Sequence, residues 1–269
     1  MKKYIVIVFS LFLGTSVKAQ GTLDLGLQFA VPTDDFKEAT DGIGAGFNIG
    51  FRVPIVKNSP VLAGFDFGYL LYGSQSQNQT LEAQITSNGQ VIDVIQMPLR
   101  IETNNNIYHT HLSIRAMAPL KFVRPYVEAM AGFRYYNTRT VIHDESPDFR
   151  WSSEEDHIIT RKEHLGDIAG SYGFGLGTQI QVGKLTYLDL RFDYLYGGKI
   201  KFYDADDTES WQVDFVSEGE WNPETSNADD IEMTATPKES FTNSYFITAG
   251  IAIQFSSDEP QGNITKINR

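Results

Sequence analysis

The feature that most constrains this chain is a set of eight segments in which apolar side chains alternate with small or polar ones. Such alternation is typical of β-strands with two chemically different faces. Each segment has about 11 to 15 residues, longer than the five or six usual in soluble sheets and long enough to cross a membrane at a tilt. The segments are Gly21–Val31, Gly42–Val53, Val61–Tyr72, Ile107–Ala118, Pro125–Asn137, Ile168–Val182, Thr186–Tyr196 and Phe241–Phe255. The pattern predicts an all-β, antiparallel up-and-down transmembrane β-barrel.

The connections between these segments alternate between long and short. Residues 32–41, 73–106, 138–167 and 197–240 form connections of 10, 34, 30 and 44 residues, whereas 54–60, 119–124 and 183–185 form connections of 7, 6 and 3. Outer-membrane barrels have short periplasmic turns and long extracellular loops. The alternation therefore predicts loops outside the cell and both termini in the periplasm of a Gram-negative bacterium.

The second long connection contains a tight-turn signal, Asn88-Gly89, between residues 81–87 and 90–97. We interpret it as a hairpin that projects above the membrane. The alternative is that its two arms are further barrel strands, which would give ten strands in place of eight.

The N-terminus is typical of a cleaved signal peptide. Lys2 and Lys3 precede a short apolar stretch, and Ala19 precedes the expected cleavage site. The apolar stretch has about ten residues, and a spanning helix needs roughly 20. We predict a signal peptide over 1–19, a barrel over 20–255, and a flexible periplasmic tail over 256–269.

Charge and cysteine content exclude several functions. The formal charge is −12 and becomes −15 without the predicted signal peptide, so binding to nucleic acid phosphates is not expected. The chain has no cysteine, which excludes thiol chemistry. Residues 138–167 hold eight acids and four bases, and residues 197–240 hold twelve acids and three bases. Most of the negative charge therefore falls at one end of the predicted barrel.

The faces opposite the apolar residues are rich in glycine and carry charges of both signs. An eight-stranded barrel has a lumen filled by side chains, so buried charges there must be balanced. Pairing across the 119–124 turn would place Arg115 opposite Glu128. The predicted lumen charge network comprises Asp24, Arg52, Asp66, Arg115, Glu128, Arg134, Asp189, Arg191 and Asp193.

His109 and His111 face the same interior beside Ser113, near the expected outer mouth. A hydrolase would need a histidine, an acid and a nucleophile within hydrogen-bond reach. No nucleophile elbow or metal motif is present. We favour histidines that are satisfied by structural hydrogen bonds, and no catalytic residue is assigned.

Two features of the long loops suggest binding. Trp151, Trp211 and Trp221 lie among polar residues and are candidates for recognition, although they would serve equally well to pack the loops together. A weak candidate metal site comprises Asp204, Asp206, Asp207 and Glu209. That cluster lacks the ligand spacing of a calcium loop, so we predict neither a metal nor a cofactor.

The sequence resembles the Bacteroidetes-type outer-membrane β-barrel proteins, whose membrane domain is similar to the OmpA/OmpX and PorT-like barrels. The resemblance rests on the Ala19-Gln20 junction, the glycine-rich strands and a last strand from Tyr245 to Phe255. It implies that Tyr245 and Phe255 belong to the signal that the barrel assembly machinery reads. The family implies no single activity, and the tail after Phe255 departs from its pattern.

These observations predict a non-enzymatic outer-membrane protein with acidic loops for recognition, adhesion or an accessory role in an outer-membrane complex. Its expected partners are outer-membrane lipid, lipopolysaccharide and other outer-membrane proteins. One alternative is a lipid or peptide hydrolase, or an acyltransferase, that uses the rim histidines. The other is a narrow pore.

Overall fold

The structure is a computed structural model, and it describes most of the chain between Gly21 and Phe255. The described residues are 21–40, 42–56, 59–87, 90–145, 158–204, 212–215, 231–234 and 236–255. The predicted signal peptide (1–19) and the predicted tail (256–269) lie outside them.

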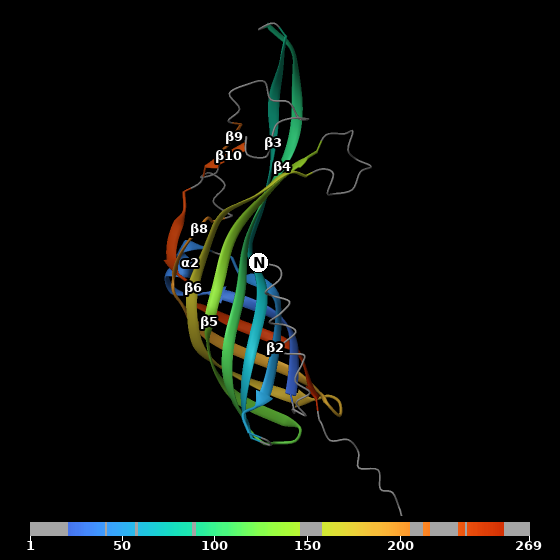
Figure 1. Ribbon diagram of the computed structural model, residues 1–269, viewed down its shortest axis with the longest axis vertical. Helices are drawn as coiled ribbons and strands as arrows, with labels where there is room; N and C mark the ends of the chain where they lie inside the picture. Colours follow the sequence, from blue (N-terminus) through green and yellow to red (C-terminus); the bar gives the residue numbers. More distant parts are fainter. Residues whose placement is uncertain are drawn as a thin grey trace, which may run out of the picture.

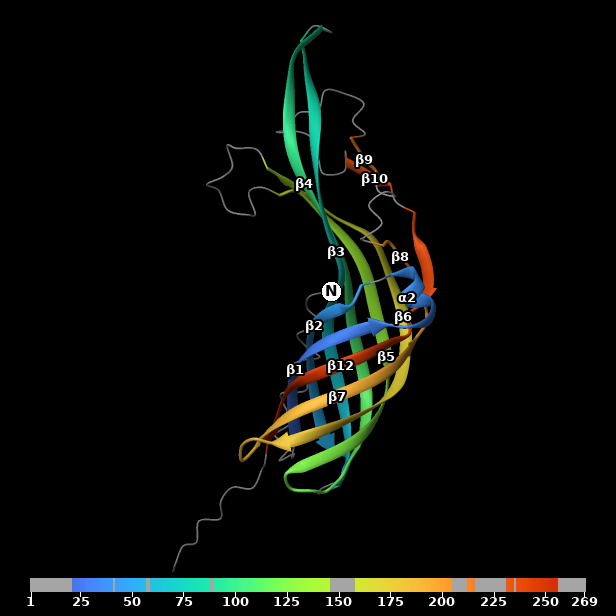
Figure 2. The ribbon, with the colours of Figure 1, turned by 180° about the vertical axis from the view of Figure 1, so that it is seen from behind.

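Eight antiparallel strands close into a ring (Figures 1 and 2). The strands are β1 (Gly21–Pro32), β2 (Gly44–Pro54), β3 (Val61–Ser87), β4 (Gln90–Met117), β5 (Val123–Asp144), β6 (Ile158–Gln181), β7 (Thr186–Gly197) and β12 (Ser244–Phe255). Each of these eight strands pairs with the next one in this order, and the ring closes where β1 pairs with β12, from Gly21↔Phe255 to Pro32↔Ser244. The prediction of an eight-stranded up-and-down barrel is confirmed.

The alternative with ten strands is wrong. The arms on either side of Asn88-Gly89 pair with each other as far as Ser87↔Gln90, and they continue β3 and β4 without adding strands to the ring. They form the tip of a hairpin that rises above the barrel, as the turn signal predicts (Figure 1).

Four neighbouring strands are much longer than the sequence patterns predict. β3, β4, β5 and β6 have 27, 28, 22 and 24 residues, whereas β1, β2, β7 and β12 have 11 or 12. Much of the connections 73–106 and 138–167 is therefore strand rather than loop. We call the parts of β3–β6 that lie beyond the barrel the upper wall: residues 73–87, 90–106, 137–144 and 158–167.

The connections at the same end contain short elements. α2 (Asp34–Ala39) follows β1, and β8 (Lys199–Phe202) pairs with β11 (Lys238–Phe241). β9 (Gln212–Phe215) pairs with β10 (Ile231–Thr234). The sequence patterns predict none of these elements, because each spans only four to six residues.

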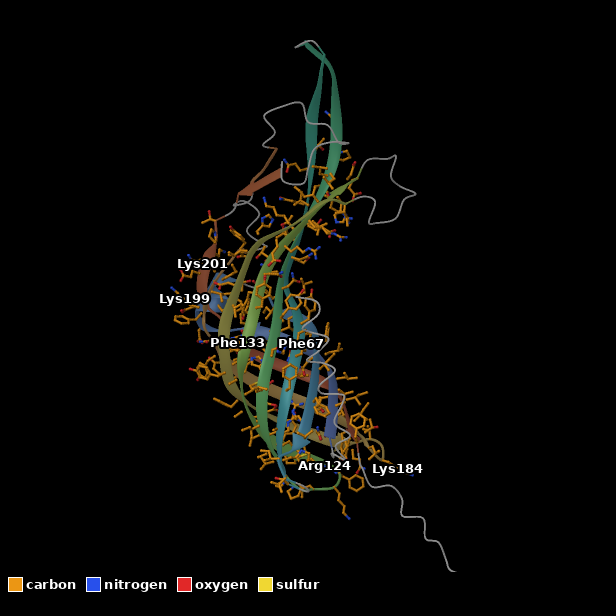
Figure 3. All side chains as sticks on the ribbon, viewed as in Figure 1. Phe67, Arg124, Phe133, Lys184, Lys199 and Lys201 are labelled. Atoms are coloured by element: carbon orange, nitrogen blue, oxygen red, sulfur yellow. The ribbon has the colours of Figure 1, made fainter. Side chains whose placement is uncertain are left out.

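The outside of the ring is apolar and the inside is polar. Outward side chains such as Leu112 (68% exposed) and Phe133 (63%) face away from the barrel, whereas Arg52 and Arg115 are 1% and 0% exposed inside it. Figure 3 places Phe67 and Phe133 at mid-height, Lys199 and Lys201 above them, and Arg124 and Lys184 at the turn end. This distribution is the reverse of a soluble protein and fits a wall that contacts lipid. No helix in the described ranges is both long enough and apolar enough to cross a membrane.

Where the strands leave the barrel, the polarity of their two faces is reversed. Tyr69, Tyr108 and Tyr135 lie side by side on the outer face, with ring centroids 5.1 and 6.3 Å apart. Above them the inner face carries buried Ile101 and Ile142, and the outer face carries Asn, Arg and Glu. Tyrosines mark membrane–water interfaces, so this reversal fixes the edge of the lipid-facing belt.

The mouth of the barrel is closed by aromatic side chains. Phe36 of α2 is 2% exposed, and its ring centroid lies 5.9 Å from those of Tyr72 and Tyr136 and 5.6 Å from that of Phe202. The same cluster includes Leu70, Ile107, Leu195 and Phe246. Aromatic pairs at these distances attract beyond the area that they bury. α2 therefore serves as a cap on the lumen.

Asp34 fastens the cap to the rim of the barrel. Its carboxylate accepts hydrogen bonds from the amide of Asn243 and the hydroxyl of Tyr194, both 3.1 Å away, and these bonds lower the pKa of Asp34. The backbone φ of Asp34 is 51°, in the left-handed region, which aspartate and asparagine adopt more readily than most residues.

We expect the cap to loosen in acid because Asp34 becomes protonated. A lowered pKa in the folded state means that the carboxylate stabilises the cap above its ordinary pKa of about 3.9 and loses this effect as the pH falls below it. A nitroxide at exposed Lys37 of α2 should be immobile from pH 7 to about 5 and more mobile below about pH 4. Asp34→Asn should remove this dependence, because the amide cannot ionise. An equal pH response in that variant would contradict the assignment.

Candidate functional site

The lumen contains a dense network of ion pairs centred on Arg52. Its guanidinium donates to Asp24, to both oxygens of Asp66 at 2.8 and 3.0 Å, and to Glu128 at 2.9 Å. These partners come from three other strands, β1, β3 and β5. All four residues are buried. Arg52 therefore ties strands on different sides of the barrel to one another.

Arg115 forms the second centre, nearer the turn end. Its Nε and Nη2 lie 2.8 and 2.6 Å from Glu128 Oε2, and the register places the two residues directly opposite, as the turn length predicts. The guanidinium also lies 3.8 Å from the ring centre of Tyr126. The Tyr126 hydroxyl donates to Asp189 at 2.9 Å. Tyr126 is two residues before Glu128 in the same strand, so the alternation in the sequence already predicts that it shares the inward face.

Arg191 links the network to Asp193. Its Nη1 donates to Asp66 at 2.9 Å, and its Nε lies 2.9 Å from the carboxylate of Asp193. Glycines make room for this crowding. A Cβ on Gly50 would lie 2.6 Å from Arg52 Nη1, closer than real contacts allow. The glycine-rich inner face is thus needed to fit the arginines.

Arg134 stands apart from the other predicted members of the network. It is 0% exposed, and within the described ranges it has no ion-pair partner. Its Nη2 donates to Thr242 at 3.2 Å, and its Cζ lies 5.9 and 5.8 Å from the ring centres of Tyr136 and Phe246. The structure therefore brings eight of the nine predicted residues together and places Arg134 above them, beneath the aromatic cap.

The histidines lie between Arg134 and the network, and their hydrogen bonds are structural in character. His109 Nε2 lies 2.6 Å from Gln28 Oε1, and His111 Nε2 lies 3.1 Å from Ser171 Oγ. Ser113 donates to Asp66 at 3.4 Å. Both histidines and Ser113 are less than 5% exposed. They lie below the cap rather than at an open rim, where a substrate would have to reach them.

The loop candidates fall mostly outside the described residues. Trp151, Trp211 and Trp221 do so, and so do Asp206, Asp207 and Glu209 of the acidic cluster. Asp204 is described, and its carboxylate pairs with Lys238 at 2.6 Å. Within the part of the chain that the structure describes, no group of three or more His, Asp or Glu residues has an arrangement that could hold a metal ion.

The two residues of the predicted assembly signal lie at opposite ends of β12. Tyr245 packs among outward rings at the rim, with ring centroids 4.8 Å from Tyr194 and 5.2 Å from Phe192. Phe255 is exposed at the turn end and pairs with Gly21. Their role in assembly stays a prediction.

A polar concavity of about 880 Å³ lies on the outer face of the upper wall, directly above the tyrosines. We call it the outer cleft. It is lined by Tyr69, Leu71, Glu102, Asn104, Asn106, Tyr108, Asn137, Arg139, Val141, His143, Ile158, Arg161 and Glu163. Most of its lining residues fall in the connections 73–106 and 138–167, which the sequence patterns predict to be loops, so the cleft could not be predicted from them.

Within the described part of the chain, the acids of the outer cleft have partners, whereas its arginines have none. Glu163 accepts from the hydroxyl of Tyr135, and Glu102 lies 3.2 Å from Arg100 and 3.7 Å from His143. Arg139 and Arg161 are exposed, and neither has a hydrogen-bond or ion-pair partner among the described residues. The cleft can therefore offer two free guanidinium groups to an anion.

The closed ring, the apolar outer wall and the charged, side-chain-filled lumen define the class: this is an outer-membrane-type β-barrel protein. No protein-family model matches the sequence, and no curated protein matches it.

Among solved structures, the chain is similar to Neisserial surface protein A, with 13% identity, a TM-score of 0.40, and coverage of 88% of this chain and 97% of that one. It is also similar to Ail, the attachment invasion locus protein of Yersinia pestis (10% identity, TM-score 0.37, 88% and 99% covered). A third is the outer membrane protease OmpT of Escherichia coli (7%, 0.34, 89% and 98%). These scores are low, and the barrel assignment rests on the hydrogen-bonded ring itself.

Proposed function

We propose that this protein is a non-enzymatic surface protein of the Gram-negative outer membrane, and that it recognises macromolecules through the upper wall and its loops. The observation that carries the proposal is the upper wall. Four hydrogen-bonded strands continue past the tyrosines and reach far above the barrel (Figure 2). A paired sheet of this size presents a fixed surface, whereas a transmembrane anchor alone needs only short connections.

The proposed orientation places the upper wall outside the cell and the termini in the periplasm. It is supported by the short turns at one end and the long, acidic connections at the other, which is how outer-membrane barrels are built. The connections 138–167 and 197–240 carry eight acids with four bases and twelve acids with three bases. The barrel strands that they join, β5 to β6 and β7 to β12, are linked at the upper end (Figure 1).

The filled lumen argues against the narrow pore. Arg52, Arg115 and Arg191 with their carboxylates occupy the lower half, and the Phe36 cluster occupies the mouth. An eight-stranded barrel leaves room for side chains rather than for a water channel.

Burial argues against the hydrolase. His109, His111 and Ser113 are enclosed, and each is bonded to a structural partner. A catalytic histidine must reach the proton that it transfers in a bound substrate.

A photo-cross-linking experiment in whole cells tests the proposal. A benzophenone side chain at exposed Gln79 or Thr80 of the upper wall should give a discrete adduct with an outer-membrane or extracellular macromolecule. The same group at exposed Lys121 of a short turn is the control and should not give that adduct. Adducts of the same identity from both ends, or none from the upper wall, would contradict the proposed role.

A further inference from the structure

We propose that the outer face of β4–β6 holds a phosphorylated glycolipid of the outer leaflet, with an acyl chain against the barrel and phosphate groups at Arg139 and Arg161. The inference goes beyond the proposed recognition function and rests on its orientation of the barrel. Three observations carry it: a hollow in the lipid-facing wall, the polar outer cleft above it, and the height of the two arginines.

The first observation is an apolar hollow of about 1120 Å³ in the lipid-facing wall. Its sides are formed by large side chains that include Leu112, Phe133 and Tyr172, and its floor includes Ala131 and Gly170. A Cβ on Gly170 would meet nothing within 4 Å, so the floor is open space. Because this wall faces hydrocarbon, the occupant that fits the hollow is an acyl chain.

The second observation is that the hollow and the outer cleft lie on the same strands. Along β4 and β5 the outward pairs run from Thr110↔Phe133 in the hollow, through Tyr108↔Tyr135, to Asn106↔Asn137 and Asn104↔Arg139 in the cleft. The hydroxyl of Tyr69 donates to Asn106 at 2.7 Å, and Asn106 donates to Asn137 at 3.1 Å. One amphiphilic molecule can therefore touch the hollow, the tyrosines and the cleft amides in order.

The third observation separates a glycolipid from a phospholipid. Arg139 lies four residues beyond Tyr135, roughly 13 Å along the strand at about 3.3 Å per residue. With the usual strand tilt of about 40°, this is about 10 Å above the tyrosines. The headgroup layer of a bilayer is only about 5 to 8 Å thick on each side. A phosphate that is carried outward on a saccharide reaches this height more readily than the phosphate of a phospholipid, and the asparagine amides are suitable partners for the saccharide.

The charges of the cleft fit such an anion. Arg139 and Arg161 have no partner among the described residues, and the nearby acids, Glu102 and Glu163, are already bonded within the protein. Arginine binds phosphate through paired, charge-assisted hydrogen bonds. The remaining lining group able to carry positive charge is His143, which lies beside Glu102.

The test measures lipid binding to the purified full-length protein by native mass spectrometry. The probes are a bis-phosphorylated, acylated diglucosamine lipid, its dephosphorylated form, and phosphatidylglycerol. The bis-phosphorylated probe should bind most tightly. Arg139→Gln with Arg161→Gln should weaken its binding by about tenfold or more and leave binding of the dephosphorylated form unchanged. The matched control, Lys121→Gln with Lys184→Gln, removes two exposed charges at the turn end and should bind the probe normally.

A second variant tests the hollow. Gly170→Leu should fill the open floor without disturbing the barrel and should weaken all acylated diglucosamine probes, phosphorylated or not. The proposal is overturned if the arginine variant binds the bis-phosphorylated probe as tightly as the parent protein. It is also overturned if phosphatidylglycerol binds equally well, or if the control variant loses as much affinity. None of these results depends on the cross-linking partner, so failure here is distinguishable from failure of the proposed function.

Discussion

Replacing Arg52 with alanine is expected to destabilise the barrel by about 3–5 kcal/mol, the effect measured when one partner of a buried ion pair is removed. Arg52 contacts three carboxylates, those of Asp24, Asp66 and Glu128, and is 1% exposed. Without it, three acids would face one another in an enclosed space, where Arg115 and Arg191 are the remaining ion-pair partners among the described residues. Denaturant titration in lipid vesicles, followed by far-ultraviolet circular dichroism, measures the loss.

The matched control is Arg100→Ala, which removes an arginine that pairs with Glu145 at 2.9 Å on the exposed upper wall. An exposed pair contributes little, so we expect a change of less than about 1 kcal/mol. We also expect partial recovery of stability when Glu128→Gln is added to Arg52→Ala, because the double variant has one buried carboxylate fewer. A small loss in the Arg52 variant, comparable to that of the control, would show that the network does not hold the barrel together.

Leu112→Arg is expected to destabilise the inserted barrel by about 2–4 kcal/mol, the range for an arginine placed on the lipid face at mid-depth. Leu112 points outward, is 68% exposed, and lies four residues from Tyr108 on the turn side. Its side chain therefore lies in the hydrocarbon region. The loss of stability is measured by denaturant titration in lipid vesicles, as for the Arg52 variant.

Gln79→Arg provides the control for this substitution, since Gln79 is exposed on the upper wall, in water. Its effect should stay within about 0.5 kcal/mol, as for ordinary surface changes. If Leu112→Arg were equally harmless, the outer wall of the barrel would not be in contact with lipid.

The membrane part of the fold could be predicted from the sequence because lipid imposes a strict rule. Every second residue must be apolar over a whole crossing, and every backbone group must be paired within the barrel. Segments such as Gly21–Val31 and Thr186–Tyr196 show this alternation, and the structure has strands there within a residue at each end.

The upper wall could not be predicted by the same rule, because the rule reverses above the tyrosines. Ile101 and Ile142 face inward there, while Asn104 and Arg139 face outward, so a search for an apolar outer face ends at the membrane edge. The inverted alternation is present in the sequence, and it is the signal that would have extended β4 and β5.

Of the contacts in the candidate site, some could likewise be predicted from the sequence and others could not. Arg115 opposite Glu128 follows from one short turn, because pairing at the turn fixes the register of both strands. The contacts of Arg52 do not follow from any one pair of strands, since they depend on how the ring closes. The isolation of Arg134 has the same cause. The alternation along β5 predicts that its side chain points into the lumen, but it does not predict how far above the acids the side chain lies.

We expect the apolar outer wall of the ring to lie in lipid and the wall above the tyrosines to lie in water, and the other predictions depend on this division. A nitroxide scan along β5 in lipid vesicles tests it directly, and the absence of natural cysteines allows single labels. Labels facing outward at Ala129, Ala131 and Phe133 should collide with oxygen and be shielded from a water-soluble nickel complex. Labels at Arg139 and Val141 should show the reverse, and inward Met130 should be shielded from both. Free access of the nickel complex to Ala129 and Ala131 would contradict the account.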